Sequence, residues 1–373
     1  MWDIFSTILL YNTVFFVAFI LCDRGEKKRD KRYIYVAYFV VTFISVIRFD
    51  IGADYDGYAR NIETIALDFQ NYGIGYFLKY QVYVKGMEPI FVLSTFLFSW
   101  SSEPTFWVFA LYSVFTMCLL YMAFDRIHGH KWGLFLFYIS CLIFFVWDGL
   151  RQGLSMAILL NALPLIKKRK LGQFLLLLLV ATLSHYSAMF FAVAYLIAKI
   201  KVNKNVSVSI CILLFLLAQL DILSGIVYFL VSIAPLYNDY YTTENVNSLF
   251  TYHDISYIFT AFWLIYLVYL IPKREKALSN IVAVGAILYI LAGGNLNVDR
   301  IGYYFSQYQL IALPLIMYQR KTELRKYIIA ACLFTLFSLC NIRVLTTTYK
   351  ECSPYETVFS KEYKSKQYRD SRW

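Results

Sequence analysis

Residues 167–204 read KKRKLGQFLLLLLVATLSHYSAMFFAVAYLIAKIKVNK, and this stretch decides the fold. Basic residues stand at both of its ends, whereas residues 171–198 between them contain no Lys, Arg, Asp or Glu. A helix of about 20 apolar residues crosses the hydrocarbon core of a bilayer, and short loops rich in Lys and Arg stay in the cytoplasm. The polar His185 divides the apolar part in two. We therefore expect two crossings that return the chain to the cytoplasm.

The rest of the chain follows the same pattern. Of its 373 residues, 60% are hydrophobic and 19% aromatic, and the mean hydropathy is +0.56. Soluble domains are closer to half apolar. Twenty of the 35 basic residues lie in five short stretches, 23–33, 167–170, 199–204, 272–276 and 319–326. This spacing is typical of cytoplasmic loops, so the net charge of +11 does not indicate nucleic-acid binding.

The parity of the crossings predicts the topology. Each interval between cytoplasmic loops must hold an even number of crossings, but residues 34–166 contain five apolar runs. The shortest, 89–100, follows Glu88-Pro89, so we interpret residues 48–105 as one external region with a re-entrant or interfacial segment. Residues 221–254 form a second external region, in which we expect an interfacial helix over residues 222–234. Parity also places the tail, 346–373, outside, although its Lys and Arg content argues for the cytoplasm.

These assignments predict an all-α integral membrane protein with about 12 transmembrane helices, folded as a single polytopic domain over residues 1–373. No metal or cofactor is predicted. Asp54 and Asp56 form one Asp-x-Asp pair without flanking ligands, and the cysteines lack zinc-site spacing. No glycine-rich phosphate loop or zinc motif is present.

Four ionisable residues are predicted to lie in the outer half of the bilayer, where charged groups are costly and mark functional sites by default. At a helix rise of about 1.5 Å per residue, Arg48 and Arg151 lie about 24 Å from the nearest cytoplasmic basic residue. By the same measure His185 lies at about 22 Å and Arg300 at about 30 Å. Guanidinium groups stay charged when desolvated and bind phosphate bidentately. We therefore expect a phosphate or pyrophosphate carried by a lipid.

Each residue also has an interpretation without a ligand. The side chains of Arg48 and Arg300 could extend to lipid headgroups. Arg151 could pair with Asp148, three residues earlier on the same helix. His185 could be a hydrogen-bonded residue at a helix end. The common depth of the four residues favours a site.

Five motifs, in this order, resemble the EpsG/Wzy-type family of bacterial polysaccharide polymerases and cover about residues 34–310. They are Arg48-x-x-x-Gly52-x-Asp54-Tyr55-x-x-Tyr58, Glu88-Pro89-x-Phe91, Arg151-Gln152-Gly153-Leu154-Ser155, His185-Tyr186-Ser187-Ala188 and Asp299-Arg300. Ser155 departs from the family, in which Ala is more frequent. No single motif is specific, and it is their order on this topology that carries the resemblance.

The resemblance implies a GT-C-like, metal-independent glycosyltransferase of the bacterial inner membrane. Its substrates would be undecaprenyl-pyrophosphate-linked oligosaccharides, polymerised at the outer face into O-antigen, capsule or exopolysaccharide. The expected partners are membrane lipid and a chain-length regulator protein, without nucleic acid. The alternatives are an O-antigen ligase, another lipid-linked sugar transferase, or a transporter of lipid-linked oligosaccharide.

The motifs and the depth estimates together predict the roles of the site residues. The predicted catalytic residues are His185, Glu88 and Arg151. The predicted substrate-binding residues are Arg48, Asp54, Tyr55, Tyr58, Gln152, Tyr186, Asp299 and Arg300.

Overall fold

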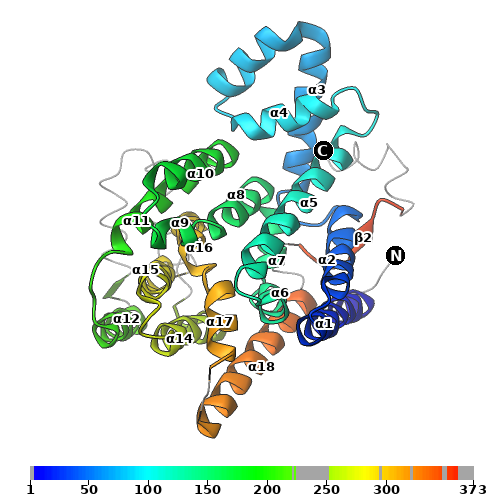
Figure 1. The fold of residues 1–373 in the computed structure, drawn as a ribbon. Coiled ribbons are helices and arrows are strands. Elements are labelled where there is room, and N and C mark those ends of the chain that lie inside the picture. The colour runs from blue at the N-terminus through cyan, green and yellow to red at the C-terminus, as the bar shows by residue number, and fades with distance from the viewer. Residues whose placement is uncertain are drawn as a thin grey trace. The chain divides into compact units, whose positions relative to one another are not determined.

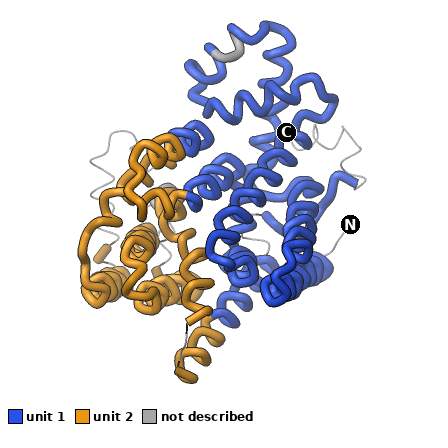
Figure 2. The backbone as a smooth tube through the Cα atoms, in the orientation of Figure 1, with its two compact units in different colours: residues 1–161, 179–186, 333–373 blue, residues 162–178, 187–332 orange. Residues whose placement is uncertain are grey.

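The computed structural model describes residues 4–220, 222–223, 252–293, 296–319, 322–346 and 351–359. Over these residues the chain is helical apart from two strands of two residues each (Figure 1), so the all-α prediction is confirmed. The chain divides into two compact units. The first unit contains residues 1–161, 179–186 and 333–373, and the second contains residues 162–178 and 187–332 (Figure 2).

The first unit is built from the N-terminal helices and from the ends of α10 and α18. Helix α1 packs against α2 and α6, and α5 packs against α2 and α8. The elements are α1 (Ile4–Lys28), α2 (Lys31–Val46), β1 (Arg48–Phe49), α3 (Tyr55–Phe77), the π-helical η1 (Leu78–Val84), α4 (Pro89–Phe98), α5 (Pro104–Asp125), α6 (His130–Ile139), α7 (Leu142–Asp148), α8 (Leu150–Leu160) and β2 (Glu356–Thr357).

Local sequence signals explain where these helices begin. The Asp30 side chain accepts a hydrogen bond from the backbone N–H of Arg32 and caps α2. Pro89 and Pro104 are the first residues of α4 and α5, where the missing proline N–H has no intrahelical partner to lose.

Two glycines allow the close approaches that shape this unit near Arg151. A Cβ on Gly153 of α8 would lie 2.8 Å from a methyl group of Val146 on α7. Gly52 has a φ of +114°, and a Cβ there would lie 3.0 Å from the Cα of Asp148. The backbone N–H of Asp54 then donates to the Asp148 carboxylate at 3.0 Å. These contacts fix the start of α3 beside the break between α7 and α8.

The tail segment 351–359 is docked on the first unit. Strand β2 pairs antiparallel with β1, so that Arg48 lies opposite Thr357. The Tyr11 hydroxyl donates to the Cys352 carbonyl at 2.7 Å, and the Tyr355 hydroxyl donates to the Ile44 carbonyl at 2.6 Å. This part of the tail therefore lies next to the end of α2, whose outer location is a sequence prediction.

The second unit is arranged around α15, which packs against α9, α11, α12, α14 and α16. Trp263 of α14 is fully buried and donates to the side chain of Gln309 at 2.9 Å. Its elements, some shared with the first unit, are α9 (Leu163–Lys167), α10 (Leu171–Ser184), the 3-10 helix η2 (Tyr186–Ala192), α11 (Val193–Ile197), α12 (Lys204–Gln219), α14 (Ile255–Leu270), α15 (Lys276–Ala292), α16 (Leu296–Ser306), α17 (Gln309–Met317) and α18 (Glu323–Leu345).

Among the described residues, the helices α1, α5 and α18 are long and apolar enough to cross a membrane. Helices α6 and α7 meet at a bend of 67° and would add a fourth span if they act together. Seven further apolar helices have only 10–17 residues. The chain is thus a membrane protein by composition, but the expected count of about 12 spans is not confirmed.

The predicted external regions differ in how much of them is described. Residues 48–105 form β1, α3, η1 and α4, with α4 in place of the predicted re-entrant run. Their position relative to a bilayer stays a prediction. The region 221–254 and its expected interfacial helix, 222–234, lie mostly outside the described residues, as does most of the tail 346–373.

Replacing Gly285 by Ala tests the packing in the second unit. A Cβ at Gly285 would lie 2.6 Å from the backbone nitrogen of Ser306, so α16 must move away from α15. We expect Gly285→Ala to destabilise the protein by about 1–3 kcal/mol, the usual cost of overpacking. The measurement is the thermal midpoint in detergent. Gly172→Ala on α10 is the matched control, because nothing lies within 4 Å of its Cβ. An equal midpoint for both variants would contradict this packing.

Candidate active site

The candidate active site in the first unit is centred on Glu88. Glu88 is the N-cap of α4, with extended backbone angles, and its side chain makes no capping hydrogen bond. The following proline sets this geometry, because a residue before proline avoids the helical conformation. The carboxylate is therefore directed away from its own helix, although its side chain is only 5% exposed.

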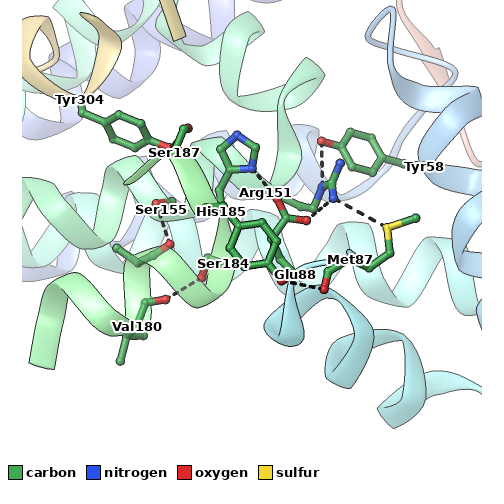
Figure 3. Close-up of polar contacts among 12 residues, drawn as sticks. Tyr58, Met87, Glu88, Arg151, Ser155, Val180, Ser184, His185, Ser187 and Tyr304 are labelled. Atoms are coloured by element: carbon green, nitrogen blue, oxygen red, sulfur yellow. Dashed lines mark hydrogen bonds and ion pairs between the residues drawn. The ribbon is translucent and has the colours of Figure 1, made fainter. Parts of the chain in front are cut away.

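The two carboxylate oxygens of Glu88 bind side chains from two other helices (Figure 3). Oε2 accepts a charge-assisted hydrogen bond from Nη1 of Arg151, the second residue of α8. Oε1 lies 2.7 Å from Nδ1 of His185, the residue after α10. One carboxylate thus joins the start of α4, the start of α8 and the end of α10.

The charge state of Glu88 sets the tautomer of His185. Burial raises the pKa of Glu88, but the hydrogen bond from His185 and the charge of Arg151 outweigh it, so this pKa lies below its ordinary value. An ionised carboxylate only accepts hydrogen bonds, so Nδ1 of His185 carries the proton. The opposite nitrogen, Nε2, accepts no hydrogen bond from the described residues. A neutral His185 therefore presents a basic nitrogen on the side away from Glu88.

Arg151 is held on several sides but keeps part of its guanidinium free. Its Nε lies 3.5 Å from the Tyr58 hydroxyl, and Nη1 lies 3.9 Å from the Met87 sulfur. The guanidinium also lies over the rings of Tyr58 and Phe91, 5.2 Å from each centroid. Its hydrogen bonds to described residues use Nε and Nη1 alone. Nη2 is left for an external oxygen, and the side chain is 22% exposed.

Of the other predicted residues of the first unit, Tyr58 and Tyr186 contact this cluster. The Tyr186 hydroxyl donates to the Met87 carbonyl at 3.1 Å, and the Tyr186 side chain is exposed. Tyr55 and Tyr58 are buried, with Tyr58 in contact with Arg151. Asp54 is exposed at the start of α3, and Gln152 is buried beside Arg151 in α8.

Arg48 lies apart from this cluster, although sequence depth placed it level with Arg151. It is only 2% exposed, and its Nη1 donates to the Ser45 carbonyl and to the Ser113 hydroxyl. The guanidinium lies over the rings of Phe109 and Trp147. Contact between Arg48 and a phosphate stays a prediction.

Asp299 and Arg300 belong to the second unit, where they lie in α16. Arg300 is exposed and Asp299 is buried. In the same unit the Ser187 and Tyr304 hydroxyls lie 3.0 Å apart. The predicted role of the Asp299-Arg300 pair on substrate is untested.

The family of the chain follows from comparison with known proteins. The model of the EpsG family matches residues 31–357, which span the whole candidate site. The chain belongs to the EpsG family. Neither a curated protein nor a solved structure matches it significantly. Family membership and the apolar helices together indicate a membrane-embedded, glycosyltransferase-like polysaccharide polymerase.

The sequence did not predict three contacts, made by two residues, in the site of this EpsG family member. Met87 supplies a sulfur to Arg151 and a carbonyl to Tyr186, and Phe91 supplies a ring face to Arg151. Met87 precedes the Glu88-Pro89-x-Phe91 motif and carries no signal of its own. Phe91 belongs to the motif, but the motif does not reveal that its ring contacts Arg151. Within the described ranges, no three His, Cys, Asp or Glu side chains gather as metal ligands.

Glu88→Gln tests the ion pairs of the site. The variant leaves Arg151 and His185 without their carboxylate, and losing such a buried partner costs about 1–3 kcal/mol. Because the pKa of Glu88 is lowered on folding, its contribution is fully present above the ordinary value of 4.5 and is lost as the pH falls through the folded pKa. We expect wild type and variant to differ in thermal midpoint at neutral pH and to converge in acid.

The control for this comparison is Glu323→Gln. Glu323 pairs with Lys326 one helical turn away, and both side chains are more than half exposed. Exposed pairs of this kind contribute little to stability. A Glu88→Gln midpoint equal to that of the control at neutral pH, or a difference that persists in acid, would contradict the proposed charge state.

Proposed function

We propose that this EpsG family protein polymerises undecaprenyl-pyrophosphate-linked oligosaccharide repeat units at the outer face of the bacterial inner membrane. The observation that carries the proposal is the binding of Arg151 and His185 to the two oxygens of Glu88. This arrangement places a guanidinium and an imidazole side by side. Transfer of a sugar from a pyrophosphate carrier requires both.

His185 is the general base of the proposed reaction. Glu88 holds the proton on Nδ1, so Nε2 can take the proton of the attacking sugar hydroxyl. The carboxylate also stabilises the imidazolium that forms, as the acidic residue does in a Ser-His-Asp triad. In this proposal Glu88, a predicted catalytic residue, is the group that orients and stabilises His185.

Arg151 stabilises the leaving group in this mechanism. Pyrophosphate gains negative charge as its bond to the anomeric carbon breaks, and a preorganised cation in a water-poor site favours that change. The free Nη2 is the donor that would reach a phosphate oxygen. Tyr58, Met87 and Glu88 hold the guanidinium in place before substrate arrives.

The transfer step balances with these groups alone. The acceptor hydroxyl oxygen forms a bond to the anomeric carbon of the donor sugar, and the bond from that carbon to pyrophosphate breaks. The hydroxyl proton moves to Nε2 of His185, and undecaprenyl pyrophosphate leaves. We assign acceptor binding to the exposed Asp54 and Tyr186, with Tyr55, Tyr58 and Gln152 shaping the site around them.

Three parts of the proposal rest on the sequence and the family. The first is a GT-C-like arrangement of about 12 crossings. The second is a contribution of Asp299 and Arg300 to pyrophosphate binding. The third is a set of partners that includes membrane lipid and a chain-length regulator protein. Whether the product is O-antigen, capsule or exopolysaccharide depends on the repeat units that the host cell makes.

Arg151→Lys tests the role of the guanidinium. Lysine keeps the positive charge but has a single terminal nitrogen, whereas the guanidinium has two. Lysine therefore cannot replace both the Nη1 contact with Glu88 and the Nη2 contact with phosphate. We expect polymer formation to fall by about 100-fold or more, as when one transition-state donor is removed. The measurement is the ladder of surface polysaccharide on a gel after complementing a deletion strain.

Arg32→Lys is the matched control, because the Arg32 guanidinium forms an exposed pair with Asp30. With the control we expect a full ladder, and with Arg151→Lys a single capped repeat unit. A full ladder from both variants would reject Arg151 as a catalytic group. Loss of every band from the deletion strain, the single unit included, would indicate a ligase or a transporter in place of a polymerase.

Metal independence has its own test. The proposed chemistry draws on Glu88, Arg151 and His185 alone, so purified protein should extend lipid-linked repeat units at an unchanged rate after treatment with a chelator. Product length on a gel, with and without added Mg²⁺ or Mn²⁺, is the measurement. A rate restored only by a divalent cation would show that the metal-free mechanism is wrong.

A further inference from the structure

Arg48 is a buried cation whose hydrogen bonds are incomplete. Its side chain is 2% exposed, and Nη1 alone finds acceptors, the Ser45 carbonyl and the Ser113 hydroxyl. Nε and Nη2 are buried and have no acceptor among the described residues. A guanidinium cannot escape this cost by losing its proton, because it remains charged in proteins. Two donors of a permanent cation are therefore unsatisfied.

No carboxylate of the described residues pairs with the charge of Arg48. None of the ion pairs among the described residues includes it, in contrast to Arg151, which pairs with Glu88. The faces of Phe109 and Trp147, with centroids 5.1 and 5.7 Å from the guanidinium carbon, supply only a partial attraction. A buried charge without a partner is strongly unfavourable, so a negative ligand in this place would stabilise the fold.

A small cavity lies against this side chain. It is lined by Arg48, by the polar residues Ser45, Tyr112, Ser113 and Thr116, and by apolar neighbours that include Trp147. The volume open to the centre of a water-sized sphere is about 10 Å³. A cavity of that size holds about one water-sized particle. This volume suits a ligand of a single heavy atom.

We propose that this cavity binds one monatomic anion of the halide class, chloride under ordinary conditions, on Nε and Nη2 of Arg48. A halide accepts hydrogen bonds from several directions, and its charge balances the guanidinium where a water molecule would not. The donors available to it are the two free guanidinium nitrogens and the hydroxyl of Tyr112, which is buried without a hydrogen-bond partner among the described residues. The site is separate from the Glu88 cluster and does not depend on the proposed polymerase activity.

The bound anion would act on the segment that carries Arg48. Strand β1 holds the tail through its pairing with β2, and it leads through Gly52 into α3, which carries Tyr58. An anion bound in the cavity therefore stabilises the packing of β1, which connects α2 to α3 and pairs with the tail strand β2. We infer that chloride is a structural ligand of the first unit.

The test is the thermal midpoint of the purified full-length protein at constant ionic strength, with sodium chloride exchanged for sodium gluconate. Gluconate is too large for the cavity. We expect the midpoint of the wild-type protein to rise with chloride and to saturate, since a ligand that binds only the folded state stabilises it in this way. Bromide should replace chloride. An identical midpoint in chloride and gluconate would overturn the proposal and indicate water as the occupant.

Two arginine variants assign the response to the cavity. Arg48→Gln should remove the dependence on chloride, whereas Arg151→Gln, which alters an arginine outside the cavity, should retain it. A chloride response that survives in Arg48→Gln, or that disappears in Arg151→Gln alone, would place the anion elsewhere and reject the assignment.

A fluorescence measurement on the wild-type protein keeps the proposal testable if Arg48→Gln does not fold. Bromide and iodide quench tryptophan, and an ion bound beside Arg48 lies close to Trp147. We expect a quenching component that saturates with halide concentration and that is absent in Trp147→Phe. The opposite outcome is quenching that increases linearly with halide concentration, with the same slope in wild type and Trp147→Phe after correction for the lost tryptophan. That outcome would refute a bound halide.

Discussion

The binding of one buried carboxylate to two basic side chains is the interaction on which the candidate site depends. Glu88 is placed by a proline-initiated helix, Arg151 by the start of α8, and His185 by the end of α10. A carboxylate that is nearly excluded from water is tolerated only with such partners. Each partner in turn gains a function from Glu88, since one guanidinium is oriented and one imidazole is fixed in a single tautomer.

The position of these helix ends depends on close backbone packing around α7. Gly153 brings α8 against Val146, and Gly52 brings the start of α3 against Asp148. These contacts give a packing role to Gly52 and Gly153, the glycines of the two motifs that begin with Arg48 and Arg151.

The sequence predicted the positions of most helices and the residues that gather at Glu88, but it could not predict how each side chain is directed. Hydrophobic runs and basic loops indicate where a helix begins and ends, and the helix rise per residue gives the depth of each residue in the bilayer. Depth does not reveal which face of a helix a residue occupies. Arg151 and His185 reach Glu88, whereas Arg48 points into a cavity. The docked tail was also missed, because it is held largely by backbone carbonyls, which accept from Tyr11 and Tyr355.

The contrast between Arg48 and Arg151 shows how surroundings divide the roles of two similar residues. Arg151 has a carboxylate partner, an exposed fraction of 22% and one free nitrogen, so it can bind an anion reversibly. Arg48 has no carboxylate partner among the described residues and is closed in by Phe109 and Trp147. An anion that binds there must be small and must remain in place. Substrate turnover therefore suits the first arginine, and a structural ion suits the second.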